Sequence, residues 1–166
     1  MAEEHSSVRE GFIAGIMGAT TIAVWFLIVD VVAGHALYTP DLLGRGLISV
    51  LGKPPAMPDT MVTHVLAYTL FHYVAFILVG VIIAWLVHQS ARTPAVLAGL
   101  LLMFVIFELG AYMVTGLFTE SRFGGMAWYQ IFIANLFATV VMGWYMVIRH
   151  PNLKRDLNAA LAGEDA

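Results

Sequence analysis

Residues 61–76 read MVTHVLAYTLFHYVAF, an apolar run that carries His64, Tyr68 and His72 at intervals of four. On an α-helix this spacing places the three side chains on one face. The apolar run continues to Val87, which is longer than the roughly 20 residues that a helix needs to cross a bilayer. Ionisable side chains inside a membrane span are costly and turn toward a bundle interior or a partner. The stretch therefore predicts a transmembrane helix with one polar face.

The whole chain has the composition of a membrane protein. Its 166 residues are 60% hydrophobic and 11% charged, and the mean hydropathy is +0.85. A soluble domain is closer to about half apolar and about a quarter charged. The net charge of -3 gives no support to nucleic-acid binding. The absence of cysteine excludes disulfide exchange, thiolate nucleophiles and iron–sulfur ligation.

Four apolar segments are each long enough to cross a membrane as a helix, namely residues 11–37, 61–87, 94–118 and 127–148. The last two connections between them are short, so we expect consecutive helices to be antiparallel neighbours. Residues 149–166 are left as a short cytoplasmic tail. We therefore predict an all-α integral membrane protein, with a single domain over residues 1–166 that forms an antiparallel four-transmembrane-helix bundle.

The basic residues predict the orientation of this bundle. Cytoplasmic loops carry an excess of Lys and Arg. One side of the predicted membrane has Arg9, Arg92, Arg149, Lys154 and Arg155, and the other has Arg45, Lys53 and Arg122. This distribution predicts a multi-pass protein of the cell (inner) membrane with both termini in the cytoplasm.

The first outer connection contains a further predicted helix, over residues 40–51. Thr39 is suited to cap it, Pro40 to its first turn and Gly52 to its end. Its leucine and valine side chains form one stripe, which is typical of an amphipathic helix at the membrane interface. We expect it to lie on the outer surface of the bundle or to cover a site as a lid.

Small residues four apart occur in the first span. Gly11 and Gly15 form one such pair, and Ala14 and Gly18 form another. Small residues at this spacing let helix backbones approach closely. We expect them to pack within the bundle rather than to form a dimer interface.

Each predicted span carries a polar residue at a similar depth. Asp30, His72, Glu108 and Asn135 lie about 10 to 16 Å from the outer end of their spans, at about 1.5 Å per residue. His64 is shallower, at about 5 Å, where we expect a hydrated imidazole. The sequence therefore predicts one polar layer in the outer half of the membrane.

Three interpretations of this layer remain open. Interhelical hydrogen bonds can fix the packing of a membrane bundle, which is a structural role. A pair formed by His72 with Glu108 or Asp30 would be proton-labile near neutral pH. Asp30, His72 and Glu108 could also bind a first-row metal such as Fe, Mn or Zn. The candidate intramembrane polar site comprises Asp30, His64, Tyr68, His72, Glu108 and Asn135.

The cofactor of such a site is not identified by the sequence. Quinone binding by His64, Tyr68 and Trp128 near the outer interface is one alternative. The sequence contains no HExxH pattern and no glycine-rich phosphate loop. We assign no catalytic residues.

The segment TTIAVWFLIVDVVAGHALYTPDLLG (residues 20–44), followed by FHYVAF (residues 71–76), resembles small bacterial inner-membrane proteins. The resemblance implies a membrane location and no particular activity. We expect a non-enzymatic accessory or scaffold component of a membrane complex. Its expected partners are the lipid bilayer and either membrane-protein subunits or further copies of the same chain. The alternative is proton-coupled transport or a metal or cofactor site on Asp30, His72 and Glu108.

Overall fold

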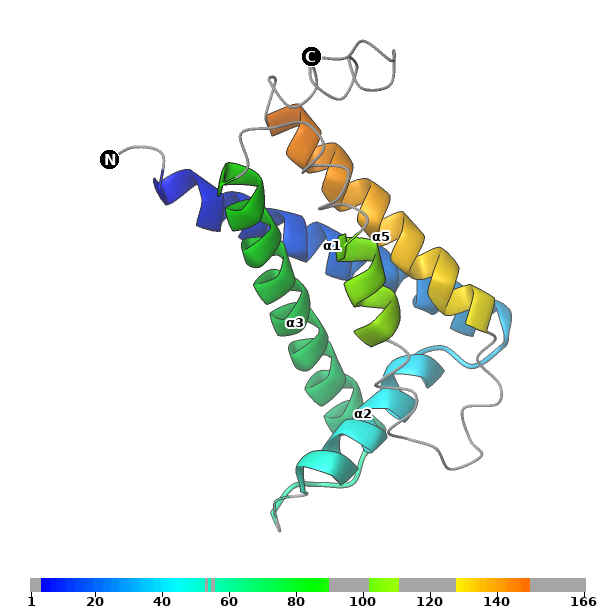
Figure 1. The fold of residues 1–166 in the computed structure, drawn as a ribbon. Coiled ribbons are helices and arrows are strands. Elements are labelled where there is room, and N and C mark those ends of the chain that lie inside the picture. The colour runs from blue at the N-terminus through cyan, green and yellow to red at the C-terminus, as the bar shows by residue number, and fades with distance from the viewer. Residues whose placement is uncertain (1–3, 53, 55, 90–101, 111–127, 150–166) are drawn as a thin grey trace.

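The computed structural model describes residues 4–52, 54, 56–89, 102–110 and 128–149. Within these ranges every regular element is helical, and none is a strand. The elements are α1 (Glu4–Val32), α2 (Tyr38–Leu51), α3 (Met61–Gln89), a helical segment over residues 102–110, and α5 (Trp128–Arg149). Figure 1 shows them in chain order from blue to orange.

Three of the described helices are long and apolar enough to cross a membrane. These stretches are Ser7–Val32 in α1, Met61–Trp85 in α3 and Tyr129–Arg149 in α5. The predicted spans 61–87 and 127–148 agree with α3 and α5 to within two residues. The predicted span 94–118 is described only over 102–110, where it is helical; its remainder and the tail from residue 150 lie outside the described residues.

The outer surface of the helices is apolar, unlike that of a soluble protein. Asp30, His72 and Asn135 are buried, whereas one face of α3 exposes an apolar residue at every fourth position: Val62, Leu66, Leu70, Val74, Leu78 and Ile82. In water the apolar side chains would be inside. An apolar outer face around buried polar groups is the arrangement that lipid favours. Length, composition and this distribution are those of a multi-pass membrane protein.

Helix α1 is antiparallel to both α3 and α5. Gly15 lies opposite Ile77 of α3 and Thr20 lies opposite Tyr73, so residue numbers increase along α1 as they decrease along α3. Along α5, Gly18 faces Met142, and further along α1 Trp25 packs edge-on against Phe137 at 5.5 Å between ring centroids. Helices α3 and α5 therefore run in the same direction.

Glycines bring α1 and α3 into backbone contact. A Cβ atom on Gly15 would lie 2.5 Å from the Cα atom of Ile77, and one on Gly80 would fall on the Gly11 carbonyl. Only glycine permits this approach. The prediction that the small residues of the first span pack within the bundle is confirmed, because Gly18 also faces inward, toward Met142 of α5.

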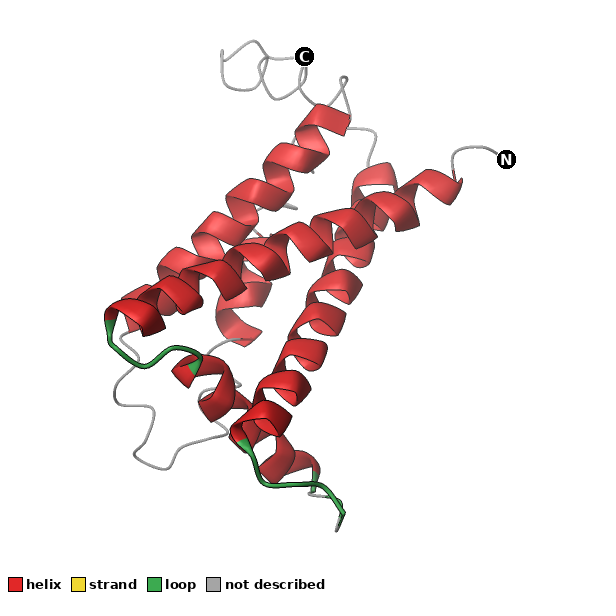
Figure 2. Ribbon diagram, turned by 180° about the vertical axis from the view of Figure 1, so that it is seen from behind, coloured by secondary structure: helices red, strands yellow, loops and turns green. Residues whose placement is uncertain are grey.

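Beyond this crossing α1 and α3 diverge, and α2 lies across their open end (Figures 1 and 2). The start of α2 contacts the end of α1, through Thr39 and Asp30. Its middle contacts the start of α3, where a side chain on Gly44 would collide with the His64 backbone. The three helices thus enclose a wedge whose narrow end is the glycine crossing.

The turn between α1 and α2 corrects one predicted boundary. The first span was predicted to extend to Leu37, but α1 ends at Val32. Gly34 has φ 81° and Leu37 has φ 66°, both in the left-handed region that a helix cannot continue through. Apolar residues run on through this turn, so hydropathy alone does not mark the end of the helix.

The start of α2 also differs from the prediction. The helix begins at Tyr38, and the position before it, Leu37, makes no side-chain capping bond. The prediction of Thr39 as the capping residue is therefore wrong, since Thr39 lies inside the first turn. The predicted end is confirmed, because α2 stops at Leu51 and Gly52 follows with φ 85°.

Candidate functional site

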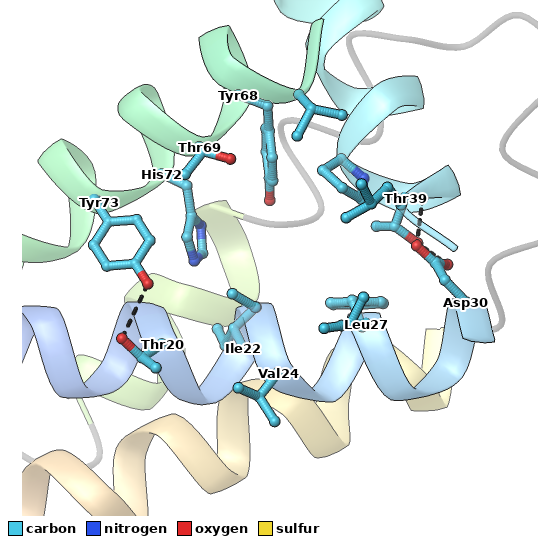
Figure 3. A pocket seen from close by; sticks show the side chains of 15 residues that line it. Thr20, Ile22, Val24, Leu27, Asp30, Thr39, Tyr68, Thr69, His72 and Tyr73 are labelled. Atoms are coloured by element: carbon cyan, nitrogen blue, oxygen red, sulfur yellow. Dashed lines mark hydrogen bonds between the residues drawn. The ribbon is translucent and has the colours of Figure 1, made fainter. Parts of the chain in front are cut away.

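Asp30 binds the first turn of α2. Its Oδ2 accepts the backbone N–H of Thr39 at 2.8 Å, and its Oδ1 accepts the Thr39 hydroxyl at 2.7 Å (Figure 3). The carboxylate is 3% exposed. The first turn of a helix has unpaired N–H groups and a partial positive charge, and both favour an acid there. The side chain of Asp30 on α1 therefore caps the N-terminus of α2.

His64 lies between two carboxylates. Its Nδ1 is 2.8 Å from Asp41 Oδ1 on α2, and its Nε2 is 2.9 Å from Asp59 Oδ1 in the connection before α3. Both nitrogens can donate to acids only when the ring is protonated. The ring is 4% exposed, so the prediction of a hydrated imidazole is wrong. His64 instead ties α2 to the start of α3.

Arg45 extends this cluster by one charge. Its Nη2 lies 3.0 Å from Asp41 Oδ2 and its Nε lies 3.2 Å from the same oxygen. Burial by itself raises the pKa of Asp41, but the hydrogen bonds from His64 and Arg45 outweigh burial, so the pKa falls below the usual 3.8. Asp41 is therefore ionised at neutral pH.

Sequence analysis missed Asp41 and Asp59 as functional neighbours of His64. Two signals were present. Asp41 and Arg45 are four apart on one helix face, and Asp59 precedes His64 by five residues at a helix start. Nothing in the spacing indicated that α2 folds back onto α3, and this contact is what assembles the cluster.

His72 contacts the backbone of α1 rather than an acid. Its Nε2 is 3.1 Å from the carbonyl oxygen of Ala19, and since a carbonyl only accepts, Nε2 carries the hydrogen. The residues that follow His72 and Ala19 also pair, since the hydroxyl oxygens of Tyr73 and Thr20 are 3.0 Å apart. The expected His72–carboxylate couple is not formed among the described contacts. The two adjacent bonds hold α1 and α3 in register.

Tyr68 and Phe76 flank His72 on α3. The Tyr68 ring stacks on His72 with centroids 5.5 Å apart and an angle of 25° between the planes. On the side of His72 away from Tyr68, the Phe76 ring centroid lies 4.7 Å from that of His72. Phe76 also stacks on Phe107, with 4.4 Å between the ring centroids. An aromatic row therefore runs from Tyr68 to the helical segment 102–110.

Glu108 and Asn135 form a separate pair. Asn135 Nδ2 donates to Glu108 Oε2 at 2.9 Å. The second oxygen, Oε1, is buried and has no hydrogen-bond partner among the described residues. This pair links segment 102–110 to α5, and it contains the one candidate acid with an unused buried oxygen.

Candidate residues line two of the cavities between the described helices. The first, of about 220 Å³, is the wedge of α1, α2 and α3, and Asp30 and His72 are among the residues that line it (Figure 3). The second, of about 260 Å³, lies against segment 102–110 and α5, with His72 and Asn135 in its lining. Four residues line both cavities and form the wall between them: Ile22 and Phe26 of α1, and Tyr68 and His72 of α3, which are its polar part.

The six candidate residues thus occupy four places rather than one. Asp30 is at the α1–α2 turn, His64 at the α2–α3 corner, Tyr68 and His72 at the wall between the cavities, and Glu108 with Asn135 at segment 102–110. Among the described residues, no three His, Asp or Glu side chains are arranged to hold a metal ion. The metal site of Asp30, His72 and Glu108 stays a prediction, as does quinone binding.

Comparisons of the chain with protein-family models, curated proteins and solved structures found no match. Its function is therefore argued from its own residues.

Proposed function

We propose that the chain is a non-enzymatic integral membrane protein that serves as an accessory or scaffold component of a membrane assembly. The observation that carries the proposal is the use of its buried polar side chains. Asp30 binds α2, His64 binds two acids outside its own helix, and His72 binds the backbone of α1. Groups engaged in this way fix how the helices of the chain itself pack, which supports a structural role rather than catalysis or transport.

The proposed membrane topology has four antiparallel spans. Helices α3 and α5 run in the same direction, and a chain that leaves one and enters the other must cross back between them. The apolar run over residues 94–118 has the length for that crossing. The helical segment 102–110 and the Phe76–Phe107 stack support it.

In this topology both termini are cytoplasmic and the membrane is the bacterial inner membrane. The distribution of Lys and Arg supports this orientation. Helix α2 lies at the outer interface, because it packs at the end of α1 farthest from the N-terminus and carries Asp41 and Arg45. It covers the wide end of the wedge.

Photo-crosslinking in living cells tests the accessory role. A photoreactive amino acid replaces Leu70 on the exposed face of α3 or Val140 on the exposed face of α5, and buried Ala138 serves as the control position. We expect one exposed face to give a defined protein adduct that also co-purifies stoichiometrically in mild detergent. Lipid adducts alone from both faces, together with a stable free monomer or homo-oligomer, would contradict the role.

A proton-coupled function is the second candidate, and Glu108 is the reason. A buried carboxyl with one unused oxygen can exchange a proton without breaking its bond to Asn135. In liposomes, proton flux that Glu108→Gln abolishes would favour this function over the scaffold. Equal flux in both proteins would end it. Elemental analysis of the wild type, His72→Ala and Glu108→Ala tests the metal alternative in the same preparations.

A further inference from the structure

The two cavities meet at the Tyr68–His72 wall, and their size is the first observation to explain. They measure about 220 and 260 Å³. An apolar protein cavity of about 150 Å³ is enough to bind benzene. Each cavity therefore has room for a molecule of one or two rings.

The lining sets the chemical character of the occupant. Aliphatic and aromatic residues supply most of it, including Ile22 and Phe26, which face both cavities. Val24 and Leu27 line the first cavity and are also 49% and 43% exposed on the outer face of α1. A lipophilic molecule dissolved in the bilayer can therefore reach this cavity from the side.

Two polar groups at the wall remain available to a ligand. In Figure 3 the Tyr68 hydroxyl points from α3 into the space above α1, and it makes no hydrogen bond with any described residue. His72 donates through Nε2 to Ala19, so in the neutral ring Nδ1 is an acceptor that no described residue uses. A donor and an acceptor thus lie on stacked rings 5.5 Å apart.

We propose that the cavities at this wall bind a small uncharged phenol. The phenolic oxygen accepts from the Tyr68 hydroxyl, and the phenolic hydrogen is donated to Nδ1 of His72. The aromatic body packs against the edges of the rings of Tyr68, His72 and Phe76, an edge-to-face contact that favours a ring over an alkyl chain. This site is independent of the accessory role proposed above.

The remaining acid of the first cavity disfavours a charged ligand. Asp30 lines the far end, where each of its oxygens already accepts a hydrogen bond from Thr39 and the start of α2 offsets its charge. An anionic ligand would be repelled, and a cation would find this carboxylate already compensated.

Ligand binding to the full-length protein in lipid nanodiscs tests the proposal. A fluorinated 1-naphthol is observed by ¹⁹F NMR, with protein-free nanodiscs as the background for partitioning. Unlabelled 1-naphthol, naphthalene and 1-naphthylmethylamine then compete. We expect saturable binding in which 1-naphthol competes roughly 3- to 10-fold better than naphthalene, as one net hydrogen bond predicts.

Two tyrosine variants make a matched pair. Tyr68→Phe removes the hydroxyl that points into the cavity but leaves Nδ1 of His72, so we expect it to reduce the preference for naphthol over naphthalene. Tyr73→Phe removes a hydroxyl that binds Thr20 instead, and it should keep the preference. If Tyr68→Phe fails to fold, the naphthol-to-naphthalene ratio of the wild type still decides the question.

Cavity-filling variants locate the ligand. Ala23→Leu fills only the first cavity and Ala75→Leu fills only the second, so at least one of them should weaken binding. Binding no greater than in empty nanodiscs, equal competition by naphthalene, or tighter binding of the amine would each overturn the proposal. So would unchanged binding in both filled variants, or an equal loss of preference in Tyr73→Phe.

Discussion

The two sides of α1 are built differently. Toward α2 and α3, Asp30 and His72 form hydrogen bonds between helices and glycines bring the backbones into contact. Toward α5 and segment 102–110, buried polar atoms lack a partner among the described residues: Trp25 Nε1, Glu108 Oε1, Thr139 Oγ1 and Tyr145 OH. Among the described residues, the first side has interhelical hydrogen bonds from α1, whereas the contacts of α1 on the second side are apolar. The buried polar atoms without a described partner gather around α5.

Substitutions of the glycines between α1 and α3 should have the largest effect on stability. In Gly15→Leu the new side chain meets the backbone of Ile77, which cannot move aside as a flexible side chain would. We expect a loss of at least about 3 kcal/mol of unfolding free energy, measured by unfolding in sodium dodecyl sulfate with circular dichroism.

Gly110→Ala is the control on the other side, since a Cβ there meets no atom within 4 Å. We expect a gain of up to about 1 kcal/mol, because alanine favours a helix over glycine. A similar loss in both variants would show that the two sides do not differ in packing.

Removing the acid at the α1–α2 turn should have the next largest effect. Asp30→Ala leaves the N–H and hydroxyl of Thr39 buried without an acceptor, which costs about 1 to 3 kcal/mol. The same unfolding assay measures it. In a double-mutant cycle with Thr39→Val the losses should not add, and strict additivity would show that this contact contributes no stability.

The corresponding change on the α5 side should be smaller. Glu108→Gln keeps an oxygen that can accept from Asn135, so we expect a change below about 1 kcal/mol. Asn135→Leu is the matched variant, and it should cost more because it leaves both carboxyl oxygens unpaired. If Glu108→Gln lowered the unfolding free energy as much as Asp30→Ala does, the proposed difference between the two sides of α1 would be contradicted.

Acid pH should have the smallest effect and should act on the α2–α3 corner. The folded pKa of Asp41 is below its usual 3.8, so its stabilisation is fully present above about pH 4 and is lost as pH falls through the lower folded value. The protection factors of α2 amides, which compare the observed exchange rate with the intrinsic rate at each pH, should fall over this range. In Asp41→Asn the protection factors should be lower at neutral pH and should lose this pH dependence, and an unchanged acid response would contradict the assignment.

The long helices could be predicted because hydropathy over roughly 20 residues is a strong signal. A residue count gives the position of a side chain along its helix. It does not give the direction of the side chain, because it does not say which neighbour a helix face meets. Asp30 was thus expected in a shared polar layer, and it instead turns toward Thr39.

The partners of His64 could not be predicted for a related reason. They depend on α2 folding back so that Gly44 meets the start of α3, and an amphipathic pattern carries no information about this contact. The candidate site stays a prediction; five of its residues line a cavity or pair across helices, and His64 joins two elements.

The position of α2 makes the width of the wedge a matter of helix length. Its contact with Asp30 is at Thr39 and its contact with α3 is at Gly44, five residues later, which is about 7.5 Å of rigid helix. An α-helix resists compression, so α2 acts as a spacer between the ends of α1 and α3. One extra turn inserted after Pro40 would lengthen the spacer by about 5.4 Å and widen the first cavity while keeping Thr39 and Pro40, the residues of α2 that line it. The volume available to a ligand thus depends on the length of α2 beyond its lining residues.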